Sequence, residues 1–334
     1  MKKYNIAIVG VTGVVGETML SILEERNFPV NNLVLLASER SSGKEYSFKY
    51  QTLIVQTLNE NSFNNIDIAL FSAGGNVSKQ YAQIAVESGC IVIDSSSAFR
   101  MDSDVPLVIP EINPEAIRTH KGILANPNCT TIVTLMALNP IRKFSRIKKI
   151  IASSYQAVSG AGQEGINELK KQNKAIVIGE KLQAKYFSHQ IASNLIPKID
   201  QMTENGFTGE EMKMVNETRK IFGDNDIKIS VTCVRVPVYT AHSVAVTIET
   251  QKKIPINKVR ELIENAEGIE LLDEPSNEVY PMPMLAEGKD NCLVGRIRED
   301  LVFENGISLW VSGDQVKKGA ALNAVQIAEK LIDE

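Results

Sequence analysis

The chain has 334 residues, of which 43% are hydrophobic and 23% are charged, and it carries a formal net charge of −4 at pH 7. This length predicts two domains of about 150 residues each, and the composition is that of a soluble globular protein. The acidic balance provides no basic surface for nucleic acid or an anionic membrane, and no apolar run approaches the length of a membrane span. We therefore expect a cytoplasmic protein that binds neither nucleic acid nor membrane.

The spacing of the cysteines also fits a cytoplasmic protein. Cys90, Cys129, Cys233 and Cys292 are widely scattered, and no two of them stand at the spacing of zinc ligands. This pattern argues for a reducing environment and against both a disulfide framework and a metal site. Two lysines precede the first apolar run, but that run contains several glycines and lacks a small-residue cleavage site, so we do not expect a signal peptide.

The first predicted strand, Tyr4 to Val9, leads directly into a glycine-rich turn and then into a helical segment, Glu17 to Arg26. The turn reads Gly10-Val11-Thr12-Gly13-Val14-Val15-Gly16, with a first gap one residue wider than in the usual dinucleotide fingerprint. Glycines let the backbone approach a pyrophosphate, which the following helix N-terminus binds. Such turns also occur for packing alone, so the motif favours nucleotide binding without deciding it.

The second apolar run, Leu33 to Ala37, ends in a segment that bears on the choice of cofactor. An acidic residue at this position binds the ribose 2′-hydroxyl of NAD, whereas arginine and hydroxyl groups suit the 2′-phosphate of NADP. Arg40, Ser41 and Ser42 favour NADP and Glu39 favours NAD, while a solvated loop would serve neither. We predict NADP.

Further short apolar runs alternate with helical patterns through the first part of the chain. The runs are Asp67 to Phe71, Ile91 to Ile93 and Gly122 to Leu124, with a helix over Val77 to Glu87. This alternation predicts an α/β domain with a Rossmann-like parallel sheet and right-handed crossovers. Ligands bind at the carboxyl ends of such strands. We therefore expect the glycine turn, the Ser72-Ala73-Gly74-Gly75 turn, Arg40, Arg100 and Cys129 at one edge of the sheet.

Past residue 145 the β-prone runs become longer and fewer helices separate them. The β-prone runs are 147–158, 227–236, 243–250, 293–298 and 307–311, and the helices are expected over 164–172, 210–222, 256–266 and 318–332. Long runs of this kind predict a second, α+β domain with a mixed or antiparallel sheet. The last helix could pack on either domain.

Cys129 stands where a strand, a turn and a helix meet. Pro127 ends the extended segment, and Asn128 is a good N-cap that would place Cys129 in the first helical turn. Unpaired backbone N–H groups and the positive end of the helix dipole favour a thiolate there. The alternative is an inert, buried thiol that serves only packing.

Two later residues could serve the same chemistry. His242 is the best acid/base candidate of three histidines, because His120 fits a solvated helix end and His189 lies in no recognisable motif. Arg235 ends a β-prone run, and its guanidinium would fit a carboxylate bidentately. Without a nucleophile nearby, the histidine could equally satisfy a turn and the arginine could lie on a solvated face.

Taken together, several motifs resemble those of the aspartate-semialdehyde dehydrogenases, over nearly the whole chain. They are the glycine turn, Ser96-Ser97-Ala98-Phe99-Arg100, Asn126-Pro127-Asn128-Cys129-Thr130-Thr131, Tyr155-Gln156-Ala157-Val158-Ser159-Gly160-Ala161-Gly162, Glu210-Glu211-Met212-Lys213, Arg235 to His242, and Gly313-Asp314-Gln315. The resemblance implies an NADP-binding Rossmann domain over residues 1–127, to which a C-terminal helix over 318–334 returns. It also implies a catalytic and dimerisation domain over 128–317, and a homodimer or homotetramer.

The implied reaction is the reversible conversion of L-aspartate 4-semialdehyde, phosphate and NADP⁺ into 4-phospho-L-aspartate, NADPH and a proton. It belongs to the aspartate pathway to lysine, threonine, methionine and diaminopimelate. The reaction needs a nucleophile that attacks a carbonyl and later leaves from a thioester, and cysteine suits both steps.

The resemblance also implies a role for each residue of its motifs. Cys129 would be the nucleophile, His242 the acid/base and Gln156 the group that orients the substrate. Arg235 would bind the substrate carboxylate and Glu210 its ammonium group, with Glu211 as the alternative to Glu210. Arg100, Asn128 and Lys213 would bind phosphate, although Lys213 could instead form a surface ion pair. The residues implied for the cofactor are Gly10, Thr12, Gly13, Val14, Val15, Gly16, Arg40, Ser41, Ser72, Gly74, Ser159, Gly160 and Gln315.

Two other functions fit parts of the sequence. N-acetyl-γ-glutamyl-phosphate reductase shares the fold, the chemistry and the Cys–His pair, but its nucleophile motif looks like Asn-Pro-Gly-Cys, and its acylated substrate has no use for Glu210. A protein that senses NADP without turnover would need neither Cys129 nor His242. We therefore expect the dehydrogenase.

Overall fold

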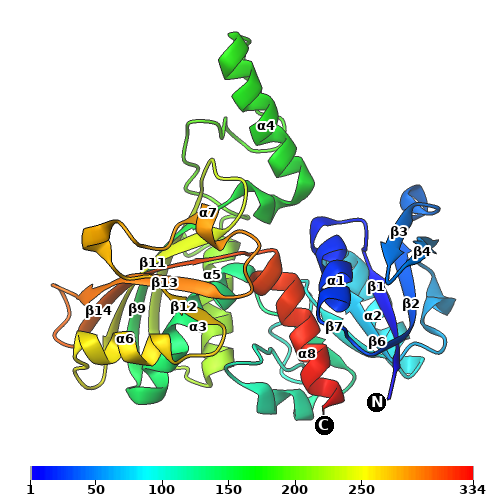
Figure 1. Ribbon diagram of the computed structural model, residues 1–334, viewed down its shortest axis with the longest axis horizontal. Coiled ribbons are helices and arrows are strands. Elements are labelled where there is room, and N and C mark those ends of the chain that lie inside the picture. The colour runs from blue at the N-terminus through cyan, green and yellow to red at the C-terminus, as the bar shows by residue number, and fades with distance from the viewer. Residues whose placement is uncertain (1, 334) are drawn as a thin grey trace. The chain divides into compact units, whose positions relative to one another are not determined.

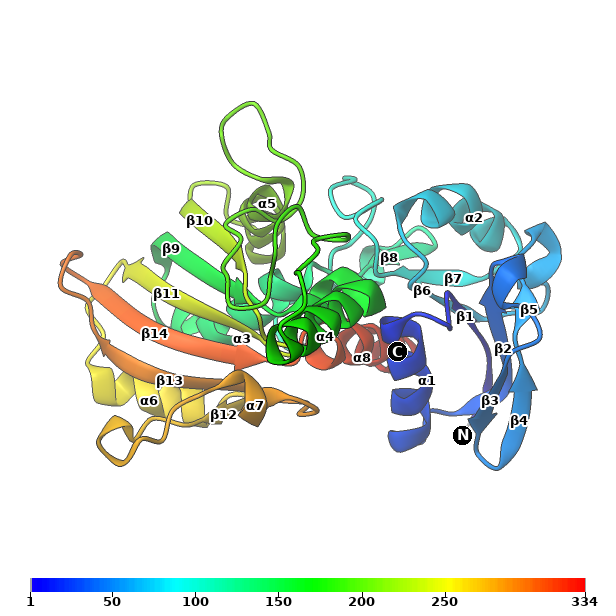
Figure 2. The same cartoon turned by 90° about the horizontal axis from the view of Figure 1, so that it is seen from above.

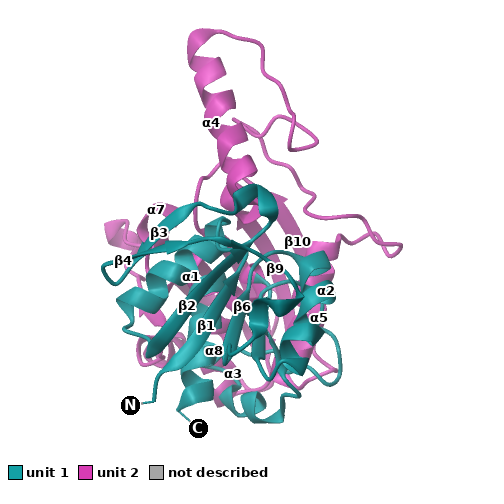
Figure 3. Ribbon diagram, turned by 90° about the vertical axis from the view of Figure 1, so that its right-hand side faces the viewer, with its two compact units in different colours: residues 1–128, 320–334 teal, residues 129–319 magenta. Residues whose placement is uncertain are grey.

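The computed structural model describes residues 2–333, and the chain divides into two compact units (Figure 3). Unit 1 extends to Asn128 and resumes at Ala320, whereas unit 2 extends from Cys129 to Gly319. The C-terminal segment thus returns to the unit that holds the N-terminal strand. The first boundary falls inside the Asn-Pro-Asn-Cys motif, so that Cys129 is the first residue of unit 2.

Unit 1 contains a six-stranded parallel sheet in the order β5-β2-β1-β6-β7-β8. The strands are β1 Tyr4–Val9, β2 Val30–Ala37, β5 Gln56–Thr57, β6 Ile68–Phe71, β7 Ile91–Asp94 and β8 Ile123–Ala125. The principal helices are α1 Val14–Glu25, α2 Gly75–Glu87 and α8 Leu322–Ile332. Helix α2 covers one face of this sheet, and α1 and α8 pack together on the other (Figure 2). The predicted Rossmann-like parallel sheet is confirmed.

The core of unit 1 explains why these segments form these elements. All four residues of β6 are buried, as expected for a strand covered by helices on both faces. Helix α1 buries Met19, Leu20, Ile22 and Leu23 on one stripe, which packs against the buried face of α8. The last helix begins at Leu322, four residues later than predicted, because a π-helical turn over Lys317–Ala321 precedes it.

Unit 1 also contains a hairpin that was not predicted, formed by β3 Glu45–Phe48 and β4 Gln51–Ile54, and the edge strand β5 was not predicted either. Lys49 and Tyr50 at its tip have φ values of 44° and 67°. A two-residue turn with both φ values positive usually carries Asn-Gly or Asp-Gly. The sequence lacks that signal, and the strands themselves are largely polar.

Unit 2 contains a six-stranded sheet in the order β10-β9-β11-β14-β13-β12. Its strands are β9 Ile147–Gln156, β10 Lys228–Arg235, β11 His242–Thr250, β12 Ile269–Leu271, β13 Cys292–Glu299 and β14 Gly306–Gly313. The pairs β9–β10 and β12–β13 are parallel, and the other neighbours are antiparallel. The predicted mixed sheet is therefore confirmed.

Helix α3, Cys129–Phe144, is the central helix of unit 2, and its residues 130–139 are all buried. It packs on one face of the sheet together with α5, Gly209–Phe222, and α6, Ile256–Glu264 (Figure 1). Strand β9 alternates between buried and exposed residues, and Ile151 and Tyr155 are exposed on the opposite face of the sheet. One face of this sheet thus packs against helices, whereas the opposite face exposes the apolar side chains of Ile151 and Tyr155 in the single chain.

A long arm follows β9, consisting of the turn η4 Val158–Ala161, helix α4 Gly162–Ile178 and an irregular segment over residues 179–208 (Figure 1). Buried Glu168 on α4 ties down the irregular segment by accepting the backbone N–H groups of Lys185, Tyr186 and Phe187. A small core of Val158, Leu169, Ile191, Ala192 and Ile196 lies beneath it. The arm is therefore an ordered part of unit 2.

The remaining elements are short. They are α7 Pro283–Ala286, η1 Glu39–Ser41, η2 Glu60–Phe63, η3 Pro114–Thr119 and η5 Pro275–Asn277. Within residues 2–333, no helix combines the length and apolar character that a membrane span requires.

Candidate active site

Cys129 is the first residue of α3, as the N-cap pattern predicts. Its side chain is partly exposed, whereas the ten residues that follow it are buried. Gly319 lies against it, since a Cβ added to Gly319 would be 3.1 Å from Cβ of Cys129. The thiol is therefore fixed at the positive end of a helix that the core of unit 2 holds rigidly.

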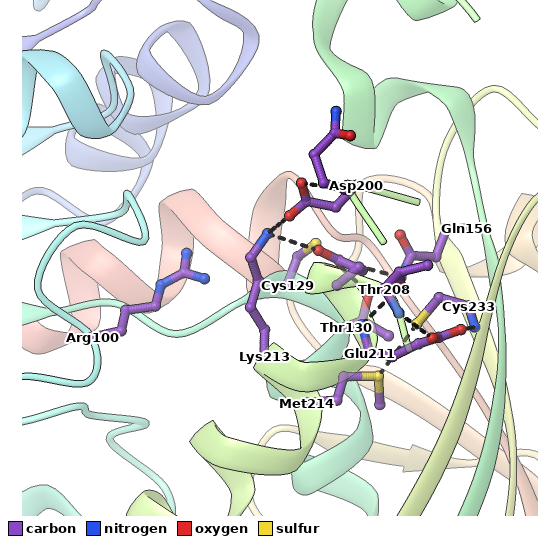
Figure 4. Close-up of polar contacts among 12 residues, drawn as sticks. Arg100, Cys129, Thr130, Gln156, Asp200, Thr208, Glu211, Lys213, Met214 and Cys233 are labelled. Carbon is purple, nitrogen blue, oxygen red and sulfur yellow. Dashed lines mark hydrogen bonds and ion pairs between the residues drawn. The ribbon is translucent and has the colours of Figure 1, made fainter. Parts of the chain in front are cut away.

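Gln156, the last residue of β9, has a side-chain amide that is buried and fixed. Its Nε2 lies 2.7 Å from Oγ1 of Thr130 and 3.3 Å from Oε1 of Glu210 (Figure 4). Both partners accept, so they fix which end of the amide carries the nitrogen. Thr130, next to Cys129, thus links helix α3 to Gln156. No role was expected for Thr130 from the sequence, although this residue lies inside the cysteine motif.

Arg235 ends β10 and is paired in register with Gln156, because β9 and β10 are parallel neighbours. The guanidinium is buried, and its Nη1 donates to the backbone oxygen of Ala157 at 2.6 Å. Burial lowers the pKa of Arg235, while the charges of Glu210 and Cys129 act in the opposite direction. Because the ordinary pKa of arginine lies far above physiological pH, Arg235 stays protonated and places a positive charge close to Glu210 and Cys129.

His242 begins β11 and is completely buried. Nδ1 accepts a hydrogen bond from the backbone N–H of Ala157 at 3.1 Å, so a neutral ring carries its proton on Nε2. Nε2 is buried and has no hydrogen-bond partner among the described residues. Burial, followed by the charge of Arg235, holds the pKa of His242 well below its ordinary value. The ring is therefore neutral at physiological pH.

Gly160 lies between these two side chains. A Cβ added to it would be 3.0 Å from Nη1 of Arg235 and 3.0 Å from Nε2 of His242. A side chain at this position would therefore press on both groups, and only glycine lets Arg235 and His242 lie this close to the backbone.

Glu210 and Glu211 occupy the first turn of α5, and the structure gives them different partners. Both carboxylate oxygens of Glu211 accept backbone N–H groups, from Thr208 at 2.7 Å and from Cys233 at 2.9 Å (Figure 4). Glu210 instead contacts Gln156 and the ammonium of Lys213, the latter at 3.2 Å. Glu211 therefore caps the N-terminus of α5 and attaches this helix to β10, whereas Glu210 faces the side-chain amide of Gln156.

Arg100 and Asn128 belong to unit 1. Arg100 is buried after β7, where its Nε donates to the backbone oxygen of Asn126 and its Nη2 to that of Ser95, each at 2.9 Å. The turn that carries Arg100 is built on Asp94, whose buried carboxylate accepts from Ser78 and Ser96. Asn128 is the last residue of unit 1 before Cys129.

The glycine turn follows β1 and fits a dinucleotide. Gly10 has a φ of 89°, and a Cβ there would meet Ala73 of the next turn at 2.9 Å. A Cβ on Gly16 would lie 2.3 Å from the oxygen of Gly10, so helix and turn pack without a gap. No side chain caps the N-terminus of α1 at Gly13, which leaves its N–H groups for a phosphate.

The residues predicted to bind the cofactor fall into two sets. Gly10, Thr12, Gly13, Val14, Val15, Gly16, Arg40, Ser41, Ser72 and Gly74 follow β1, β2 and β6 at one edge of the sheet of unit 1. Ser72 donates its hydroxyl to the backbone oxygen of Val9 at 3.1 Å. Ser159, Gly160 and Gln315 belong to unit 2, where the amide of Gln315 donates to Oγ of Ser159. Among residues 2–333, no cluster of three or more His, Cys, Asp and Glu could hold a metal ion.

Comparison with known proteins assigns this architecture. A model of the semialdehyde dehydrogenase NAD binding domain matches residues 5–120, and one of the semialdehyde dehydrogenase dimerisation domain matches residues 138–318. The aspartate-semialdehyde dehydrogenase of Aquifex aeolicus (strain VF5) is 55% identical over 335 residues, which cover 99% of this chain and 98% of that protein. The chain belongs to the aspartate-semialdehyde dehydrogenase family.

Other family members agree over the full length. The Bacillus subtilis (strain 168) aspartate-semialdehyde dehydrogenase is 49% identical, with 98% of this chain and 97% of that protein covered. A crystal structure of aspartate semialdehyde dehydrogenase II complexed with ASA from Vibrio cholerae has a TM-score of 0.98 at 50% identity, covering 100% of this chain and 99% of that one. The chain is accordingly an oxidoreductase of the aspartate pathway of amino-acid biosynthesis, with a domain for a nicotinamide cofactor.

Proposed function

We propose that this chain interconverts L-aspartate 4-semialdehyde and 4-phospho-L-aspartate, with NADP and inorganic phosphate, through a thioester on Cys129. The observation that carries the proposal is the grouping of Cys129, Gln156, Arg235 and His242 within unit 2. Thr130 joins the cysteine helix to Gln156, and Ala157 joins Arg235 to His242. A nucleophile, an amide, a fixed cation and a neutral imidazole suit the addition of a thiolate to an aldehyde and, after hydride loss, the transfer of the resulting acyl group to phosphate.

In the dehydrogenating direction, Cys129 adds to the aldehyde carbon as a thiolate, and the carbonyl oxygen becomes an oxyanion. The nicotinamide cofactor, when bound, accepts the hydride that this carbon loses. The product on the protein is then a thioester of Cys129, formed without any net proton transfer. Hydrogen phosphate cleaves the thioester, which regenerates the thiolate and releases the proton of the overall reaction.

For His242 the geometry supports a narrower role than general base. Because Nδ1 already accepts from Ala157, the neutral ring presents an N–H at Nε2. This group would donate a hydrogen bond to the oxyanion of the Cys129 adduct, as oxyanion-hole donors do. Gln156 would donate to the same substrate or orient it, since Thr130 and Glu210 fix its amide.

The remaining charged side chains would each bind the part of a substrate that carries the opposite charge. Arg235 would bind the substrate carboxylate bidentately, and Glu210, rather than Glu211, would bind the ammonium group, since both oxygens of Glu211 accept backbone N–H groups. Arg100, Asn128 and Lys213 would bind phosphate. A dianion needs several donors of this kind.

We further propose that unit 1, with the C-terminal helix, binds NADP rather than NAD. Arg40 and Ser41 lie on the turn η1 immediately after β2, where a 2′-phosphate would be recognised. Residues of the glycine turn, with Ser72 and Gly74, would hold the pyrophosphate, and Ser159, Gly160 and Gln315 would contact the nicotinamide end. The scattered cysteines support a cytoplasmic location.

Unit 2 would also form a homodimer. The matching family model is named a dimerisation domain, and one face of the sheet exposes Ile151 and Tyr155. Tyr155 also packs against Trp310 of β14, with ring centroids 5.3 Å apart. Exposed aromatic and aliphatic side chains on a sheet are typical of an interface core.

The test uses Cys129→Ala in the full-length protein. We expect phosphate-dependent formation of NADPH from aspartate semialdehyde to disappear, while NADP binding stays within about twofold, because the glycine turn is untouched. In the parent protein, rapid quenching without phosphate should give a covalent acyl adduct that mass spectrometry locates on Cys129. Turnover by the variant, or an adduct on another residue, would remove the assignment.

A further inference from the structure

Lys213, on the first turns of α5, is held by two carboxylates (Figure 4). Its Nζ lies 2.8 Å from Oδ2 of Asp200 and 3.2 Å from Oε2 of Glu210. Burial disfavours the ammonium ion, but the two carboxylates raise the pKa of Lys213 overall. Burial likewise opposes the charge of Asp200, and Lys213 lowers the pKa of that carboxyl overall. The ammonium group of Lys213 is thus shared by two carboxylates, and one of them, Glu210, is also acted on by the positive charge of Arg235.

The loop that carries Asp200 fixes the position of its carboxylate. Asp200 lies in the irregular segment before α5 and has a φ of 73°, a conformation that Asp and Asn tolerate better than most residues. Its Oδ1 accepts the N–H of Gln201 at 2.8 Å. Gly209 makes room for the carboxylate, since a Cβ there would lie 2.7 Å from Oδ2 of Asp200. The loop therefore presents an anion directly to Lys213.

This arrangement is unfavourable for phosphate. If Lys213 binds phosphate, as proposed above, the incoming dianion meets a lysine whose charge is already paired with the carboxylate of Asp200. Glu210 can be neutralised by the ammonium group of the substrate, but Asp200 has no such partner in the proposed complex. Repulsion from Asp200 would then remain unless its side chain leaves the lysine.

We propose that Asp200 competes with inorganic phosphate for the ammonium group of Lys213. In the absence of phosphate, Asp200 pairs with Lys213; when phosphate binds, the lysine exchanges the carboxylate for the phosphate oxygens. Asp200 thereby weakens phosphate binding without contacting the reacting atoms. The inference rests on the proposed function of Lys213 and assigns Asp200 a role in setting the affinity for phosphate.

The test is Asp200→Asn in the full-length protein. Asparagine tolerates the positive φ and keeps an acceptor for Gln201, so that only the charge is removed. We expect the KM for phosphate to fall about two- to fivefold, the range for a partly exposed ion pair, with kcat and the KM values for semialdehyde and NADP unchanged. A higher KM for phosphate, or parallel changes in all parameters, would overturn the proposal.

Two further variants separate this inference from its premise. Asp226→Asn removes the same charge elsewhere in unit 2, where Asp226 pairs with Arg146 at 3.4 Å, and should leave the KM for phosphate unchanged. Lys213→Met should raise that KM, and Asp200→Asn should lower it less in that background than in the parent protein. An unchanged KM in Lys213→Met would refute the phosphate role of the lysine itself. A raised KM there, without the fall in Asp200→Asn, would refute the competition alone.

Discussion

The side-chain amide of Asn323 donates a hydrogen bond to Oδ1 of Asn126 at 2.7 Å, which ties the C-terminal helix to the segment before the cysteine. Asn323 is fully buried on α8 and also donates to the backbone oxygen of Val108 at 3.0 Å. Asn126 in turn donates to Ser95, and its backbone oxygen accepts from Arg100 at 2.9 Å. The last helix thereby positions the turn that carries Arg100.

We predict that Asn323→Asp affects phosphate binding although Asn323 contacts no substrate group. Aspartate has the same shape but cannot donate, so Oδ1 of Asn126 loses its donor and two acceptors meet. The free energy of unfolding should fall by about 1–3 kcal/mol, the cost of a buried unsatisfied group. The KM for phosphate should rise more than the KM for NADP, because Arg100 is held through Asn126.

The matched control for that prediction is Gln326→Ala on the same helix, whose side chain donates to Glu111 at 2.9 Å. It should lower stability without changing the KM for phosphate selectively. Urea denaturation and steady-state kinetics measure both quantities. Equal effects of the two variants on the phosphate KM would show that Asn323 acts only through general stability.

His242 offers a test that separates a hydrogen-bond donor from a general base. Glutamine carries an amide donor near the position of Nε2, whereas the shorter asparagine places its amide near Nδ1, where its oxygen can accept from Ala157 but no donor reaches the position of Nε2. If Nε2–H stabilises the oxyanion, His242→Gln should keep at least about tenfold more kcat than His242→Asn, since one such donor is worth about 10²–10³ in rate. Equal losses in both variants would instead support general acid/base catalysis.

The burial of His242 also predicts a pH dependence of stability. The pKa of His242 is lowered in the folded state, so the unfolded state binds more protons as the pH falls through its own value of about 6.5. The stability that neutral, buried His242 contributes is fully present above its unfolded-state pKa. It is lost as the pH falls from that value toward the lower pKa of the folded state. Between pH 7.5 and 5.5 the loss should be about 1.4 kcal/mol, measured by denaturant unfolding at both values.

The His242→Gln variant should lack that part of the pH dependence. His189→Gln is the control, since His189 is exposed and should leave the dependence as it is in the parent protein. If His242→Gln and the parent lose the same free energy between the two pH values, His242 is not the group responsible.

The sequence allowed the sheet of unit 1 and the start of α3 to be predicted for a physical reason. A strand buried on both faces, such as Ile68–Phe71, must be apolar throughout, and the chain shows this directly. The helix start at Cys129 follows from local chemistry, namely Pro127 and Asn128. Such signals lie within a few residues of one another and do not depend on the rest of the chain.

Contacts made only by the tertiary fold could not be read in this way. Glu210 and Glu211 are adjacent and chemically identical, and only the positions of Thr208 and Cys233 separate their roles. The approach of Asp200 to Lys213 depends on the path of an irregular loop with mixed sequence signals. The hydrogen bond between Thr130 and Gln156 likewise depends on the packing of α3 against β9.

The exposed face of the sheet in unit 2 gives the last prediction. Ile151 is 48% exposed and shares this face with Tyr155 and Trp310, so a homodimer formed there would bury it. Ile151→Arg would place a charge in the interface core, where an unpaired charge is strongly unfavourable. We expect the variant to shift toward monomers at micromolar concentration in sedimentation equilibrium, with helix content unchanged.

The control is Leu301→Arg, at a position that is 99% exposed in the turn between β13 and β14, and this variant should stay dimeric. A dimer of Ile151→Arg as stable as that of the parent would exclude this face as the interface.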